Sequence, residues 1–368
     1  EQSWGFFAPL SYLDYLGNTS KLKEGDALTE LNGVEFCKKY VSPATQRAIA
    51  CANKQGTISL KHYVPMFHEH FDTAQLRMNL HNIPKYALLY FTEKCHGTSQ
   101  RTAHVLAPKE FTKWQLLFNK FVRKYKWLGL KPNDPANQPM TWQVLTGTRR
   151  MVLSPHPVFE KTQFRNIIHN QLAPKLYKGE TIYYEVVGYN DNNNPIMPVH
   201  STLRVKDEDK ELALKLEKEY GDTIFYSYGC ARDGHSSSFT IAEDPTLIPP
   251  QHRVIVYRIT QTNIDNKVTE LSWPQVKHRC AQLNLEFAKE LIDHPIVYDG
   301  QESTVLKLIG PLADGHSTYD HRHLREGVCL RVEAPGIFNI YKYKGFAFCV
   351  LEGIKKNDND YVDPEDLY

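Results

Sequence analysis

The chain has 368 residues and a formal net charge of only +2, and 41% of its residues are hydrophobic. This length is enough for two or three domains with packed cores. The near-zero charge excludes nucleic-acid binding by a global positive field, so any nucleic-acid site must be a local patch.

The sequence also lacks the signals of membrane and secreted proteins. No run of about 18 apolar residues occurs, so we expect no transmembrane helix. The first residues, EQSWGFF, have neither a basic region nor a long apolar stretch and do not fit a signal peptide. The seven cysteines are widely spaced without a C-x-x-C pair, which favours reduced thiols over disulfides or zinc. We therefore expect a cytoplasmic protein, or a nuclear one in a eukaryote, that is not secreted.

Residues 1–80 are expected to form a first, β-rich unit. Short strands are predicted at 48–51 and 57–60, on either side of the turn sequence NKQG. Short strands joined by polar turns fit a small barrel or an incomplete one. The remaining residues, 81–368, form the second predicted unit.

A lysine follows the first strongly predicted strand of the second unit. Residues 86–92 are apolar and rich in β-formers, which predicts a buried strand, and Lys94 and Gly97 come directly after it. Burial disfavours an ammonium ion and lowers its pKa, which makes a lysine nucleophilic near neutral pH. Gly97 would let the backbone turn sharply and approach a ligand closely. The same residues also fit a surface lysine before a glycine turn, and only downstream features decide between the two.

An amphipathic helix is predicted over 109–128, after a second strand at 102–106. Its apolar stripe consists of Phe111, Trp114, Leu117, Phe118, Phe121, Val122 and Tyr125. Its other face carries Lys113, Lys120, Arg123, Lys124 and Lys126. This basic face either is simply solvated or follows a phosphate backbone.

Two polar features stand in the middle of the chain. A Gly-Thr-Arg-Arg turn at 147–150 places Arg149 and Arg150 between short apolar strands, where they can grip phosphate or carboxylate. In the predicted strand 180–189, Glu185 lies on one face of an otherwise apolar segment. A buried carboxylate needs hydrogen-bond donors, so Glu185 either contacts a ligand or belongs to a structural ion pair.

From residue 159 onward, the sequence predicts further helices and strands. Helices are predicted at 159–172, at 206–220 and from the capping residue Ser272 to about residue 292. Strands are predicted at 253–260, 324–332 and 340–348. Lys342 and Lys344 are two residues apart in the last strand, and the two-residue period of a strand places both ammonium groups on one face.

Three histidines and two aspartates gather in a segment that also contains glycine and serine. They are Asp314, His316, Asp320, His321 and His323. This set could bind a metal, but the composition of the segment favours a solvated loop.

These features stand in an order that resembles a known family. The chain resembles the covalent nucleotidyltransferase superfamily of ligases and mRNA capping enzymes. The features that carry this resemblance are, in chain order, a Lys-x-x-Gly, a Gly-Thr-Arg-Arg turn, a strand glutamate, a Glu-Gly before an apolar strand and a Lys-x-Lys strand. Several segments of the sequence are similar to those of ATP-dependent RNA ligases. These segments are TEKCHGTS, LTGTRRMVL, KGETIYYEVVGY, HRVIVYRIT, REGVCLRVE and YKYKGFAFCVLEGI. Within these they resemble the Deinococcus-type nick-sealing group, which has an appended N-terminal domain. The resemblance covers residues 83–356.

The resemblance implies a three-step chemistry. Lys94 would attack the α-phosphorus of ATP, expel pyrophosphate and form a lysyl–AMP phosphoramidate. AMP would pass to the 5′-phosphate of a nucleic acid, and a 3′-hydroxyl would then expel AMP. By this resemblance Lys342 and Lys344 contact the α-phosphate, and Glu326 holds a catalytic Mg²⁺ or Mn²⁺. His96 is typical of RNA ligases and would act after lysine adenylation.

The resemblance also implies contacts to the nucleoside. Glu185 would bind the ribose hydroxyls, and Arg149, or alternatively Arg150, would grip a phosphate or the ribose edge. Tyr257 would stack on adenine, and Glu93 would help read the base. Many family members have Asp after the aromatic residue at the position of Tyr257, whereas here Arg258 follows it.

The expected protein is of the α+β class. Its main domain would be an adenylation domain of antiparallel sheets flanked by helices, and residues 1–80 would resemble an oligonucleotide-binding (OB) barrel. Only 24 residues follow Lys344 (368 − 344), so we expect residues 1–80 to clamp the substrate in place of a C-terminal domain.

The expected function is an ATP-dependent RNA ligase that joins 3′-hydroxyl and 5′-phosphate ends, as a monomer and at nicks whose 3′-hydroxyl strand is RNA. Two alternatives remain. One is another nucleotidyltransferase, either a DNA ligase or a GTP-dependent capping-type enzyme. The other is a non-catalytic nucleic-acid-binding protein on the same scaffold.

Overall fold

The chain divides into two compact units in the computed structural model. One comprises Glu1–Ser59 with Asp363–Tyr368, and the other Leu60–Val362. The structure describes residues 9–17, 19–20, 22, 30–31, 34–35, 64–71, 73–109, 111–133, 137–149, 151–153, 163–207, 209–232 and 249–353.

In the first unit, the described elements are a 3₁₀ helix, η1 (Leu10–Leu13), and the antiparallel strands β1 (Glu30–Leu31) and β2 (Val34–Glu35). The strands expected at 48–51 and 57–60 lie outside the described residues, so the OB-like domain stays a prediction. The division by contacts falls after Ser59, whereas the sequence placed a boundary after residue 80. Leu76 and Leu80 are buried in a core of the second unit, which gives 74–80 its place there.

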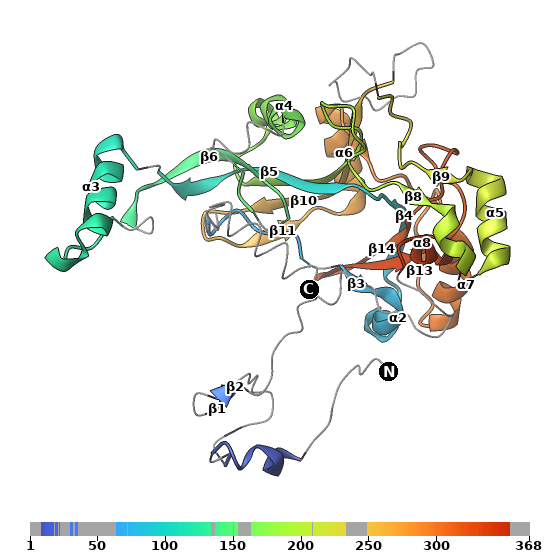
Figure 1. The fold of residues 1–368 in the computed structure, drawn as a ribbon, viewed down its shortest axis with the longest axis horizontal. Coiled ribbons are helices and arrows are strands. Elements are labelled where there is room, and N and C mark those ends of the chain that lie inside the picture. Colours follow the sequence, from blue (N-terminus) through green and yellow to red (C-terminus); the bar gives the residue numbers. More distant parts are fainter. Residues whose placement is uncertain are drawn as a thin grey trace. The chain divides into compact units, whose positions relative to one another are not determined.

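The second unit is of the α+β class, as expected (Figure 1). Its five-stranded sheet, within the part of the chain that is described, has the order β13-β4-β14-β15-β3. Its strands are β3 (Ala74–Gln75), β4 (Leu88–Lys94), β13 (Ile296–Val297), β14 (Gly327–Ala334) and β15 (Ile337–Lys344). All pair antiparallel except β3, which runs parallel to β15.

A larger sheet lies beside it in the same unit (Figure 1). Its described strands follow the order β11-β10-β7-β5-β6, and β12 pairs parallel with β10. They are β5 (Thr98–Pro108), β6 (Met140–Gly147), β7 (Glu180–Gly188), β10 (His252–Thr262), β11 (Val268–Glu270) and β12 (Glu286–Phe287). The strands predicted at 180–189 and 253–260 are thus confirmed.

The described part of this unit also contains seven α-helices. They are α2 (Leu76–Asn79), α3 (Lys113–Lys124), α4 (Gln163–Leu172), α5 (Lys210–Tyr220), α6 (Trp273–Leu283), α7 (Glu302–Ala313) and α8 (Phe346–Leu351). Short 3₁₀ helices are η2 (Leu80–Asn82), η3 (Lys126–Leu128), η6 (Ala173–Lys175) and η7 (Thr202–Asp207), and β8 (His200–Ser201) pairs with β9 (Thr223–Ile224). None of the helices in the described ranges is long and apolar enough to cross a membrane.

The five-stranded sheet has one apolar face and one polar face. Leu89 and Phe91 of β4 lie in an apolar core with Leu330 of β14 and with Val305 and Ile309 of α7. Side chains alternate across a strand, so the residues between them face the other way. The other face therefore carries Lys94 of β4 and Lys342 and Lys344 of β15.

Two predicted elements end earlier than the sequence suggested. The helix that starts after Ser272 was expected to reach residue 292, but Asn284 adopts a left-handed backbone conformation and ends α6 at Leu283. The strand predicted at 340–348 ends at Lys344, because Gly345 packs against the backbone of Ala313 and caps α8.

The predicted amphipathic helix is α3, and a capping box between Thr112 and Gln115 sets its start. Figure 1 shows α3 at the outer end of β5 and β6. Its apolar stripe is not covered within the described residues: Trp114 is 82% exposed and Phe121 46%, whereas Val122 is buried.

Candidate active site

The three lysines singled out in the sequence share one face of the five-stranded sheet. Lys94, the last residue of β4, pairs with Gly327 of β14, and Gly327 pairs on its other side with Lys344 of β15. Two residues along, Lys342 pairs with Cys329. Lys342 and Lys344 therefore lie on the face of Lys94, as their spacing predicted.

Glu326 joins two of these lysines. Its carboxylate is 1% exposed, and its Oε1 atom accepts a hydrogen bond from Lys94 Nζ at 2.6 Å. Lys344 Nζ lies 3.6 Å from the same oxygen. A buried carboxylate must be compensated by cations and donors, so this contact fixes the end of the Lys94 side chain.

Gly327 is what allows these side chains to meet. A Cβ atom there would collide with the backbone of Tyr343 and Lys344 on β15. Only glycine lets β14 and β15 pair closely at this point, directly beside Glu326.

Cys329 lies at the centre of the charged groups. Burial raises the pKa of its thiol to about 11. Lys94 and Lys342 act to lower that pKa, and Glu326 and Glu185 act to raise it. Four of the sequence-predicted site residues thus lie within electrostatic reach of one partly buried thiol.

Glu185 reaches the site from the six-stranded sheet. It lies on β7 and is half-buried, and it pairs in register with Ser99 of β5. A Cβ atom at Gly97 would collide with Glu185 Cγ and the Val186 carbonyl. We expected Gly97 to make room for a ligand, whereas here it makes room for β7 and brings Glu185 beside the Lys94 turn.

Glu93 faces away from Lys94 and is occupied by protein donors. Its carboxylate is 2% exposed and accepts hydrogen bonds from Ser317 Oγ at 2.6 Å, Thr318 Oγ1 at 2.6 Å and the Thr318 N–H at 2.7 Å. These three bonds tie β4 to the loop before β14. Glu93 still acts on the same neighbour as two other predicted site residues, because Glu93, Glu185 and Glu326 all raise the pKa of Cys95.

Tyr257 lies on β10 near Glu185. Burial raises its pKa, and the Glu185 carboxylate adds to this rise. Its hydroxyl is 3.1 Å from Ser99 Oγ, and its ring meets His70 edge-on at 5.0 Å. The neighbouring Arg258 donates hydrogen bonds to Glu270 from two nitrogens of its guanidinium group and stacks on the ring of Tyr183. These contacts give Arg258 a structural role.

Arg149 lies in the same neighbourhood. Its carbonyl accepts a hydrogen bond from the Arg101 guanidinium. Burial lowers the pKa of His70, and Arg258, Arg149 and Arg101 lower it further. This places the Arg149 charge within reach of the His70 ring that touches Tyr257. Arg150 lies outside the described residues.

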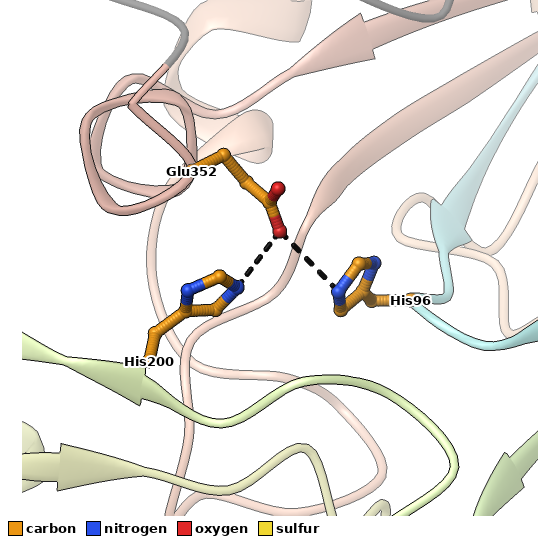
Figure 2. Close-up of side chains that lie close together, drawn as sticks. All are labelled: His96, His200 and Glu352. Carbon is orange, nitrogen blue, oxygen red and sulfur yellow. Dashed lines mark hydrogen bonds and ion pairs between the residues drawn. The ribbon is translucent and has the colours of Figure 1, made fainter. Parts of the chain in front are cut away.

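His96 connects the lysine site to a second group (Figure 2). Its Nδ1 atom lies 3.7 Å from Glu326 Oε2, and its Nε2 atom lies 3.4 Å from Glu352 Oε1. His200 Nε2 lies 2.8 Å from the same Glu352 oxygen. Burial lowers the pKa of His96, although the two glutamates oppose this shift.

Sequence reasoning missed His200 and Glu352. His200 follows a loop without any recognisable pattern, and Glu352 stands near the end of YKYKGFAFCVLEGI, where nothing marks it as different from a surface glutamate. The fold joins them because β8 and the end of α8 meet beside the turn after β4 (Figure 2).

The histidine cluster predicted at 314–323 has structural partners. His316 Nε2 lies 3.0 Å from Glu219. Asp320 binds Arg322, Ser227 and the Gly229 N–H. Among the described residues, the group of three potential metal ligands with donor atoms within 4.8 Å is instead His96, His200 and Glu352.

No protein-family model and no curated protein sequence matches the chain. Its fold is similar to solved structures of an RNA ligase from Naegleria gruberi. The complex of that ligase with pyrophosphate is 13% identical, over 94% of this chain and 72% of that one, with a TM-score of 0.43. A mutant with ATP and Mn is 11% identical, over 79% of this chain, with a TM-score of 0.40. In that comparison the match spans 59% of the length of the Naegleria protein.

Proposed function

We propose that this protein is an ATP-dependent RNA ligase that forms a covalent AMP adduct on Lys94. The observation that carries the proposal is the buried cluster on the five-stranded sheet, where Lys94 Nζ lies 2.6 Å from Glu326, with Lys344 on the same oxygen. A lysine at a strand end, held by a carboxylate and flanked by further lysines, suits attack on a phosphate.

The charges of the cluster fit the proposed reaction. As Lys94 attacks the α-phosphorus of ATP, negative charge builds up on the phosphate oxygens and on departing pyrophosphate. Ammonium groups preorganised at that point stabilise this charge without having to reorganise. Lys342 and Lys344 share the face of Lys94, which supports this role for them.

Glu326 is the residue that would hold Mg²⁺ or Mn²⁺. Its Oε2 atom is buried and has no hydrogen-bond partner in the described part of the chain. A spare carboxylate oxygen of this kind is a ligand that both ions accept. When bound, the ion would neutralise phosphate charge. Glu326 in turn holds Lys94 in position.

The nucleoside half of the site comes from the other sheet. Glu185 would bind the ribose hydroxyls, and Tyr257 and Arg149 lie farther along that side. The roles of Tyr257 on adenine, of Glu93 in base reading and of Gly97 at the ligand stay predictions. The contacts of Glu93 with Ser317 and Thr318 favour a structural role for it.

The nucleic-acid substrate needs a surface of its own. Helix α3 exposes Lys113, Lys120 and Lys124 together with the ring of Trp114. Basic side chains next to an exposed aromatic ring fit the backbone and bases of a nucleic acid. We include α3 in the proposed substrate surface. The proposed substrate has a 5′-phosphate and an RNA 3′-hydroxyl end at a nick, and the proposed enzyme is a monomer.

Mass spectrometry after incubation with ATP or GTP and Mg²⁺ tests this proposal, with protein first stripped of bound nucleotide. An AMP adduct that Lys94→Arg abolishes supports it, because arginine keeps the charge but is not a nucleophile. The control is Lys277→Ala, since Lys277 pairs with Glu290 at 3.0 Å outside the site. A GMP adduct would instead indicate a capping-type enzyme, and no adduct a non-catalytic protein.

Sealing assays on nicked duplexes test the later steps. We expect His96→Ala to form the AMP adduct but to fail to seal nicks with an RNA 3′-hydroxyl. Nicks that are all DNA serve as the comparison. Equal sealing of both substrates would contradict the preference for RNA.

A further inference from the structure

The side chains of His96, His200 and Glu352 come from three distant parts of the chain and converge on one point (Figure 2). His96 follows β4, His200 starts β8, and Glu352 follows α8. Their donor atoms all lie within 4.8 Å of one another. Two imidazoles and one carboxylate are the ligand set of many zinc sites with an open fourth position.

The distances fit a four-coordinate ion. Two ligand atoms that each lie about 2.1 Å from a tetrahedral ion are about 3.4 Å apart. His96 Nε2 is 3.4 Å from Glu352 Oε1, and His200 Nε2 is 2.8 Å from the same atom. Small side-chain rotations would therefore be enough to place all three atoms around one ion.

Protein hydrogen bonds leave part of this cluster unexplained. His200 Nε2 is within hydrogen-bonding distance of Glu352, but His96 Nε2 is buried without a hydrogen-bond partner in the described structure. A buried polar atom without a partner is costly, and a bound ion or water is one way in which native proteins satisfy such an atom. The His96 nitrogen is aimed at Glu352, where an ion would give it a partner (Figure 2).

The surroundings hold the imidazoles in place. The ring of His96 meets those of Tyr226 at 4.8 Å and Phe348 at 5.0 Å, and His200 meets the same two rings at 5.5 Å and 6.3 Å. On its other side, His96 presents Nδ1 to Glu326 Oε2 at 3.7 Å. A carboxylate behind a histidine is the outer partner that orients many metal-bound histidines.

We propose that His96 Nε2, His200 Nε2 and Glu352 Oε1 bind one Zn²⁺ ion or a similar divalent transition metal. Nitrogen donors distinguish this site from the Glu326 oxygen proposed for Mg²⁺, because Mg²⁺ prefers oxygen ligands. The bound ion would fix the His96 ring and keep its Nδ1 facing Glu326. The site does not depend on ligase activity, so the two proposals can fail separately.

Metal titration of the chelator-treated full chain tests the site. Wild type is expected to bind one equivalent of Zn²⁺ or Co²⁺ and, with Co²⁺, to give the intense visible absorption of four-coordinate cobalt. Millimolar Mg²⁺ should not displace the ion. Glu352→Gln is expected to weaken binding at least about tenfold, since even loss of an outer partner costs about 10–100-fold. Its side chain is 26% exposed, so this variant should fold, and its circular dichroism spectrum would check this.

The matched control is His316→Gln, because His316 also pairs with a glutamate but lies at the surface. This change should leave the stoichiometry and affinity unchanged. His200→Gln should behave like Glu352→Gln, and the same concentration of Zn²⁺ should raise the Tm of wild type more than that of either variant. Binding that survives both changes, or that His316→Gln removes, would overturn the proposal.

Discussion

Buried charges occur in both large sheets, but they are arranged differently. In the six-stranded sheet, Arg258 binds Glu270 through two nitrogens, and Glu180 of β7 is bound in the same way by Arg279 of α6. In the five-stranded sheet, two lysines approach one oxygen of Glu326, whose other oxygen has no hydrogen-bond partner among the described residues. A bidentate pair satisfies both partners and needs no ligand. The Glu326 cluster keeps a spare acceptor, as expected of a site that takes up an ion or substrate.

Replacing one carboxylate in each sheet should give the largest difference between the two sheets. Glu326→Gln is expected to lower AMP-adduct formation at least about a hundredfold, since it removes charge at the reacting groups. Glu270→Gln is expected to leave adduct formation intact but to lower the free energy of unfolding by up to about 3–5 kcal/mol, because it leaves Arg258 buried without a counter-charge. Rates of labelling and urea denaturation measure the two effects. Equal loss of labelling in both variants would contradict the distinction.

A methyl group at Gly327 should separate the strands that carry the lysines. Gly327→Ala is expected to cost about 1–3 kcal/mol of stability through overpacking against Tyr343, and to slow labelling. Urea denaturation of both proteins measures the cost. Gly310→Ala in α7 is the control, because no atom lies within 4 Å of its added Cβ. That change should be neutral or slightly stabilising, since alanine favours a helix. A neutral Gly327→Ala would show that the close pairing is not required.

Acid should weaken the loop that anchors β4. Burial lowers the pKa of His323 below its ordinary 6.5, against the opposing effect of the Leu324 carbonyl. Its Nε2 accepts a hydrogen bond from the Tyr228 N–H, so the neutral ring is required. The His323 ring therefore binds a proton more readily in the unfolded chain than in the folded one. The stability that the neutral His323 ring contributes is therefore fully present above about pH 6.5. It is lost as pH falls through the pKa of His323 in the folded chain, at up to about 1.4 kcal/mol per pH unit. Denaturation of wild type and His323→Gln between pH 7 and 5 should show a smaller slope in the variant.

The smallest expected effect concerns α3. Lys120→Ala should weaken binding of a nicked duplex and reduce the slope of log affinity against log salt by about 0.9 if it contacts one phosphate. Fluorescence anisotropy at several salt concentrations measures this slope. Lys307→Ala on α7, also at the surface, should leave the slope unchanged. Equal slopes in all three proteins would remove α3 from the proposed substrate surface.

Local patterns in the sequence predicted which residues share a strand face, but not which residues from distant parts of the chain lie beside them. The period of a strand placed Lys342 and Lys344 on one face, and the register of β14 and β15 confirms this. The pairing of Lys94 with Glu326 joins residues 232 positions apart, and no local pattern encodes it. His200 and Glu352 were missed for the same reason. The stripe of α3 predicted a helix correctly, but periodicity does not tell whether another element covers that stripe.

The central claim is that Lys94, rather than Lys342 or Lys344, carries AMP. Proteolysis of the adduct and tandem mass spectrometry would locate the modified lysine directly. We expect all AMP on the peptide that contains Lys94, because that side chain makes the shorter contact with Glu326 and directly precedes the turn that Glu185 approaches at Gly97. AMP on Lys342 or Lys344, or on none of the three, would contradict the proposed mechanism.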